Sequence, residues 1–109
     1  MTHTQLDAVI HAPVRLAILS VLVSVKEADF NYLKKITGAT DGNLSTHLSK
    51  LEQKEYVKIE NVFKGKKPAT ICRMTRHGRD AFSNYLKALE DVIHFPGRET
   101  EVKSSETKV

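Results

Sequence analysis

The hydrophobic pattern in the middle of the chain predicts an amphipathic helix with an unusual polar face. Leu44, Leu48 and Leu51 recur at i, i+4 and i+7, so they share one side of the helix. Thr40 is expected to cap its first turn. The opposite side carries mostly short hydrogen-bonding side chains and almost no acid: Gly42, Asn43, Thr46, Ser49, Lys50 and Gln53. Most amphipathic helices carry long Glu/Lys pairs there, so this face departs from the ordinary solvated pattern.

The period changes from helical to alternating after residue 56. The apolar positions then fall as in a half-buried strand: Val57, Ile59 and Phe63. A second strand is expected over residues 69–74. Between the two, Gly65 permits a positive φ and Pro68 closes the turn, so the sequence predicts a hairpin.

Shorter helices are expected before residue 40. Residues 5–11 are predicted as a short helical start, and a helix from Pro13 to about Val25 is apolar nearly all round, so it is expected to be buried on more than one side. Residues 28–30 suit either a short strand or the lead-in to a third helix, which runs to about Thr37 and stops at Gly38.

A long final helix is expected from its cap at Thr75 to about Phe95. It is longer than a small domain needs for its own core, so its apolar stripe predicts pairing with a second subunit as a homodimer. Residues 1–95 are thus expected to form one domain, followed by a disordered polar tail at 96–109. The predicted dimer interface combines both ends of the domain: Leu6, Val9, Ile10, Phe82, Tyr85, Leu86, Leu89 and Ile93.

Positive charge is concentrated around the predicted hairpin. Over the whole chain, 17 Lys and Arg residues face 13 acids, and the net charge of +4 is too mild to decide anything. Between residues 64 and 79, however, six cations occur with no Asp or Glu: Lys64, Lys66, Lys67, Arg73, Arg76 and Arg79. Such clustering is typical of surfaces that bind phosphates.

The sequence predicts neither a metal nor another cofactor. The single cysteine, Cys72, excludes an intramolecular disulfide and a multi-cysteine metal site, and a buried small hydrophobe is favoured over a redox sensor. A His/Asp/Glu metal site formed across a dimer stays open. No signal peptide is visible, and the apolar run at 16–25 is too short to span a membrane, so a cytoplasmic location is expected.

The order of these elements resembles the winged helix-turn-helix transcriptional regulators of the MarR/ArsR kind, from Leu6 to about Leu89. The more specific parts are the Leu-Ser-x-His-Leu-x-x-Leu segment at 44–51 and the Thr-x-x-Gly-Arg segment at 75–79. The resemblance implies an α+β fold, with a two-stranded wing and long terminal helices, that binds double-stranded DNA. The cysteine pairs that sense metals in some ArsR-type regulators are absent from this sequence.

The predicted DNA contacts follow from this arrangement, in which the helix after Thr40 enters the major groove. The expected base-reading residues are Asn43, Thr46 and Lys50. The expected backbone contacts are Thr40, Ser45, His47, Lys64, Lys66, Lys67 and Arg73, with weaker candidates at Lys34 and Lys35. His47 could instead cover the core edge, and Arg73 could form an intramolecular ion pair.

Other functional classes fit less well. No glycine-rich phosphate loop or paired carboxylates on an apolar face suggest an enzyme, so a non-enzymatic protein is expected. A winged-helix protein-interaction module and a nonspecific architectural DNA-binding protein stay as alternatives. The operator, the regulated genes, the sign of regulation and any small-molecule effector are not readable from the sequence.

Overall fold

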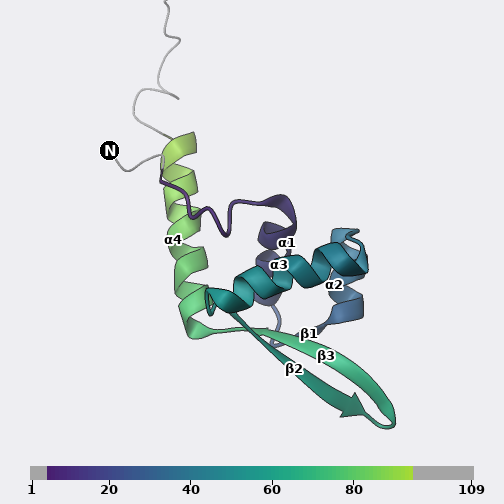
Figure 1. Ribbon diagram of the computed structural model, residues 1–109. Helices are drawn as coiled ribbons and strands as arrows, with labels where there is room; N and C mark the ends of the chain where they lie inside the picture. Colours follow the sequence, from purple (N-terminus) through teal and green to yellow (C-terminus); the bar gives the residue numbers. More distant parts are fainter. Residues whose placement is uncertain (1–4, 95–109) are drawn as a thin grey trace, which may run out of the picture.

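The computed structural model describes residues 5–94 and confirms the predicted α+β winged-helix architecture. In Figure 1 the short helices gather on one side of a small sheet, a hairpin runs out from the body, and the last helix stands along the opposite edge.

None of the helices within residues 5–94 is long and apolar enough to cross a membrane. The tail predicted at 96–109 lies outside the described residues. The elements are α1 (Pro13–Leu22), β1 (Ala28–Asp29), α2 (Phe30–Thr37), α3 (Asp41–Gln53), β2 (Val57–Lys64), β3 (Lys67–Met74) and α4 (Arg76–Ile93).

The predicted helix boundaries are set by side-chain caps. The Asp29 side chain accepts the N–H of Tyr32 at the start of α2. Thr40 does the same for Asn43 at the start of α3, over 3.1 Å. Gly38 ends α2 with a φ of 71° and donates its N–H to a carbonyl of the last turn. Gly38, in the left-handed conformation, and the cap at Thr40 form the turn between α2 and α3. The predicted helix-turn-helix motif is therefore confirmed.

The sheet is antiparallel in the order β1-β3-β2. Residues 28–29 form a short strand against β3, which settles the alternative left open by the sequence. Lys64 pairs with Lys67, so the turn is only two residues long, and Gly65 adopts a φ of 65° there. Pro68 therefore lies in β3 and not in the turn. Because β1 does not reach that position, β3 has an open edge beside Pro68, where a missing N–H is tolerated.

We call β2 and β3 the wing, and residues 63–68 the wing tip. The alternation predicted for β2 holds only near the body of the domain. Val57 is 2% exposed, whereas Phe63, predicted to be half-buried, is 75% exposed. The reason is length: the hairpin extends past the last helix that could cover it, as Figure 1 shows.

The predicted helical start at residues 5–11 is wrong, because the chain forms a turn there. Asp7 Oδ1 accepts the N–H groups of Val9 and Ile10, over 2.9 and 3.3 Å. Short acidic side chains compete in this way with the helical ladder for backbone donors. The turn directs Ile10 into the core, where it is fully buried.

The core forms around α1, as expected for a helix that is apolar nearly all round. Ile18, Leu19 and Leu22 are fully buried within it. α2, α3, the residue before β2, the sheet and α4 add further side chains: Leu33, Leu44, Leu48, Leu51, Tyr56, Val57, Cys72, Phe82 and Tyr85.

Two chain junctions, from α3 to β2 and from β3 to α4, are joined by a close backbone contact. Thr75 donates its N–H to the Tyr56 carbonyl over 3.0 Å and its hydroxyl to the Glu55 carbonyl over 2.6 Å. Its hydroxyl oxygen also caps α4 by accepting the N–H of Gly78. A Cβ at Gly78 would lie 2.1 Å from the Tyr56 carbonyl oxygen, so only glycine fits. The predicted Thr-x-x-Gly-Arg segment is thus a docking element for α4.

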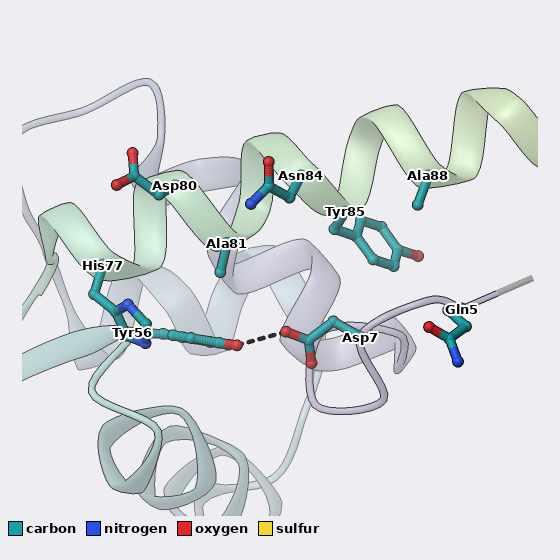
Figure 2. Close-up of a pocket in the computed structure, with 9 residues that line it drawn as sticks. All are labelled: Gln5, Asp7, Tyr56, His77, Asp80, Ala81, Asn84, Tyr85 and Ala88. Atoms are coloured by element: carbon teal, nitrogen blue, oxygen red, sulfur yellow. Dashed lines mark hydrogen bonds between the residues drawn. The ribbon is translucent and has the colours of Figure 1, made fainter. Parts of the chain in front are cut away.

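The N-terminal segment is attached to the same junction. The Tyr56 hydroxyl donates to Asp7 over 2.5 Å, across a hollow of about 360 Å³ beneath α4 (Figure 2). Burial, with smaller contributions from the Asp7 hydrogen bond and charge, raises the pKa of Tyr56 to about 12. Tyr56 therefore stays a neutral hydrogen-bond donor well above neutral pH.

We expect Gly78→Ala to destabilise the fold by about 2 kcal/mol or more, because the new methyl group meets backbone and cannot rotate away. Gly42→Ala is the matched control: a Cβ there meets nothing within 4 Å, so the variant should gain up to about 1 kcal/mol of helix propensity. Denaturant unfolding of both variants measures the difference. Equal stability of the two would contradict the close approach.

We also expect one of the three tyrosines to titrate near pH 12 while the fold persists. Because the pKa of folded Tyr56 lies above the unfolded value of about 10, its contribution to stability is complete below pH 10 and is lost as pH rises from 10 through 12. Tyrosinate absorbance follows the titration, and Tyr56→Phe should remove the late step. A single step near pH 10 for all tyrosines would count against the Asp7 contact.

Candidate nucleic-acid interface

The exposed face of α3 is the one that the sequence predicts. Leu44, Leu48 and Leu51 are turned into the core and are at most 2% exposed. The residues predicted to form the opposite face are all exposed: Gly42, Asn43, Thr46, Ser49, Lys50 and Gln53. Ser45, a predicted backbone contact, is exposed as well. This face therefore offers amide, hydroxyl and ammonium groups, which are the groups that contact base edges and phosphates.

His47 lies at the edge of this face and is held in one tautomer. Arg15 Nη1 of α1 lies 2.9 Å from His47 Nδ1. Since a guanidinium only donates, Nδ1 accepts and the ring proton must be on Nε2. Burial, and then the charges of Arg15 and Lys50, lower the pKa of His47 below its ordinary value. Near neutral pH the ring is a neutral Nε2–H donor, suited to a phosphate oxygen.

The two helices of the motif are also tied by charge. Lys34 of α2 forms an ion pair with Asp41 of α3 over 2.8 Å, which engages a residue that the sequence offered as a weak phosphate contact. The Thr40 hydroxyl is occupied as the α3 cap. Lys35 is exposed at the end of α2. A surface pair of this kind adds little stability, so its main effect is to neutralise an acid beside the α3 face.

The wing separates the predicted backbone contacts into two groups. Lys64, Lys66 and Lys67 are exposed at the wing tip. Arg73 lies near the body and forms ion pairs with Glu27, over 3.0 Å, and with Glu60. Its hydrogen bond holds the pKa of the Glu60 carboxyl below the ordinary value. Arg73 thus forms the intramolecular ion pairs that the sequence left open beside a contact with the DNA backbone.

Among residues 5–94 the ion pairs involve only Lys34 and Arg73 as cations. The three wing-tip lysines thus keep their charge for a ligand. Figure 1 shows the wing running away from α4 toward the edge of the molecule where α2 and the start of α3 lie. The α3 face and the wing tip together form the candidate interface.

Part of the predicted dimer interface is used inside the chain. Ile10, Phe82 and Tyr85 are at most 4% exposed and belong to the core, so they cannot form an outer surface. The Tyr85 hydroxyl also lies 2.8 Å from His11 Nδ1. Leu6, Val9 and Leu89 are partly buried against the core. The apolar side chains left exposed on α4 are Leu86 and Ile93, each 46% exposed.

Cys72 is fully buried opposite Ile59 in the sheet. Burial raises the pKa of its thiol to about 11, so the group is protonated near neutral pH and a poor nucleophile. This agrees with the favoured interpretation of Cys72 as a small hydrophobe. Within residues 5–94, no group of three or more His, Cys, Asp or Glu residues is arranged to hold a metal ion.

Sequence reasoning missed two features of this interface. Arg15 orients His47 from 32 residues away, and no local pattern signals that contact. The exposure of Phe63 was missed because an alternating pattern predicts which residues share a face of a strand. It does not predict where along the strand the packed helices end. A signal was present in the adjacent run of lysines, which marks a segment outside the core.

Comparison with known proteins gives a consistent result. A model described as a winged helix DNA-binding domain matches residues 14–93. An uncharacterised protein of Methanocaldococcus jannaschii is 42% identical over 79 residues, which are 72% of this chain and 85% of that protein.

Two solved structures are similar in fold. The transcriptional regulator homologue from Pyrococcus horikoshii OT3 has a TM-score of 0.75 at 31% identity, covering 80% of this chain and 86% of that one. The Salmonella typhimurium protein ytfH, proposed to be a transcriptional regulator, has a TM-score of 0.62 at 23% identity, with 78% and 74% coverage. At that identity the likeness concerns the fold alone. With its helix-turn-helix, cationic wing and matching model, this chain belongs to the winged helix DNA-binding domain family.

Proposed function

We propose that this protein is a sequence-specific, dimeric regulator of transcription that binds double-stranded DNA in the manner of the compact MarR/ArsR-like regulators. The observation that carries the proposal is the exposed face of α3, whose six residues include no acid and are backed by buried leucines. The position of Asn43 and Thr46 on that face suits adenine and thymine, respectively. The role we propose is intracellular and non-enzymatic.

In this mechanism α3 lies in the major groove and the wing tip contacts the flanking backbone. Asn43, Thr46 and Lys50 meet base edges, while Ser45 and the Nε2–H of His47 meet phosphates. Lys64, Lys66 and Lys67 neutralise further phosphates and release condensed counterions. Arg15 takes part indirectly, because its hydrogen bond fixes the tautomer of His47.

Selection of bound duplexes from a random pool tests the proposal, and an enriched palindrome is expected. Asn43→Ala and Thr46→Ala should each weaken binding to that site by about 1–3 kcal/mol and relax the preference at particular base pairs. Ser20→Ala, on the exposed side of α1, is the control and should leave both affinity and selected sequence unchanged.

Two results would argue for the alternatives. Binding without enrichment, governed by salt alone, would favour a nonspecific architectural protein. No binding to any duplex would favour a protein-interaction module.

Dimerisation is supported by the outer side of α4. Leu86 and Ile93 are seven residues apart, so they share one face of the helix, and Leu89 borders them. Two large, exposed apolar side chains on one face of α4 suit pairing with the same face of a second copy. The two α3 helices would then reach half-sites about 10–10.5 base pairs apart, or a multiple of that spacing.

We expect Leu86→Glu to raise the dimer dissociation constant by roughly tenfold or more, because it places a charge in an apolar contact. Asn84→Glu adds the same charge on a different side of α4 and should have little effect. Sedimentation equilibrium compares the two variants at micromolar protein. A wild-type protein that stays monomeric under these conditions would rule the dimer out.

A further inference from the structure

Phe63 is an exposed aromatic residue at an unusual place. Its side chain is 75% exposed, the largest value among the exposed large hydrophobic residues of the described chain. It lies two residues before the tight turn and is followed at once by Lys64. A side chain this exposed contributes little to the core, and it lies beside the cationic turn of the candidate interface.

Phe63 lies on the face of the wing that continues into the core at Cys72 and Val57, but a polar pair separates it from them. Phe63 is opposite Pro68, so the two rings share one face of the hairpin and form an apolar ridge. The next pair on that face is polar, with the Thr70 hydroxyl donating to Asn61 over 2.9 Å. A hollow of about 330 Å³, lined by Asn61, Pro68 and the start of α2, adjoins this face of the wing. Because this polar pair lies between them, the apolar surface of the ridge is not continuous with the core.

Charge indicates what the ridge meets. No Asp or Glu occurs between residues 61 and 79, and Arg73 is already neutralised by Glu27 and Glu60. The remaining cations of the wing tip lie next to this ridge along the chain: Lys64 and Lys67 form the adjacent pair, whose side chains lie on the opposite face of the hairpin, and Lys66 lies in the turn. A polyanion can approach this tip, whereas a second positively charged wing would be repelled. The apolar ring of Phe63 gains nothing from contact with phosphate. In a complex with DNA it must therefore lie beyond the sugar–phosphate backbone, in the groove.

We propose that Phe63 is a wedge that enters the DNA minor groove beside the α3 site and partly unstacks a base step there. The proposal rests on the DNA binding proposed above and adds a second mode of recognition to it. The lysines hold the phosphates that border the groove, and Pro68 supports the phenyl ring from the neighbouring strand. The wedge kinks the duplex toward the major groove, where α3 lies.

With this wedge, binding also depends on base pairs that no side chain contacts by hydrogen bonds. Unstacking costs least at pyrimidine–purine steps, which are the most easily kinked. Selected sites are therefore expected to carry a TA or CA/TG step under the wing, outside the bases that α3 contacts.

The test uses the full chain and a selected duplex labelled at both ends for energy transfer, with 2-aminopurine at the flanking step. Wild-type protein should bend the duplex and raise the 2-aminopurine fluorescence. Phe63→Ala should abolish both signals and weaken binding roughly tenfold, without changing the slope of log affinity against log salt. Phe63→Leu, which keeps an apolar wedge, should restore most of the bending.

The Lys66→Ala, Lys67→Ala double variant is the matched comparison. It should lower the salt slope by about 2 while the bound duplex stays bent at saturating protein, because only phosphate contacts are lost. The melting temperature of Phe63→Ala should equal that of the wild type, since the ring is exposed.

The outcomes separate this inference from the proposed function. Normal specific binding by Phe63→Ala with unchanged bending and fluorescence would overturn the wedge alone. A shift of Phe63→Ala from dimer to monomer in sedimentation would also overturn it, by assigning Phe63 to a contact between copies. Failure of the wild-type protein to bind any duplex would overturn both proposals.

Discussion

The close approach of Gly78 to the Tyr56 carbonyl is the contact on which the arrangement of this domain depends. At this point the chain leaving α3 and the chain entering α4 meet, with Thr75 bonded to both Glu55 and Tyr56. Glu55 itself has a φ of 62°, which is unusual for a residue with a side chain and holds the end of α3 in a sharp turn. The strain is tolerated because the hydrogen bonds from Thr75 fix the backbone around it.

Because both ends of the wing start from this junction, its direction relative to α3 is fixed there. β2 begins directly after Tyr56, and β3 ends directly before Thr75. The Tyr56 hydroxyl extends the same junction to Asp7, which in turn shapes the segment that places Ile10 in the core. This junction therefore holds α3, the wing and α4 in fixed positions relative to one another.

Much of this fold was predictable from sequence, and the failures share a cause. Periodicity predicted the faces of α3 and of the first part of β2, and Thr40 and Thr75 predicted the starts of α3 and α4, because these signals are local. The turn at Asp7 was missed because its carboxylate outcompeted a helical pattern of apolar residues. The Arg73 ion pairs, the Arg15–His47 contact and the exposure of Phe63 depend on tertiary neighbours. The exposure of the α3 face was therefore predictable, but which cations form ion pairs within the chain was not.

The distribution of acids explains how one hairpin can serve both stability and binding. Glu27 and Glu60 lie at the base of the wing, where they neutralise Arg73 within the sheet. Beyond Glu60 the wing has no carboxylate of its own, so the cations at the tip repel one another and favour extension of their side chains into solvent. That repulsion is relieved when phosphates approach. The hairpin is longer than the core requires. Its outer part therefore leaves both the lysines and the ring of Phe63 exposed to solvent.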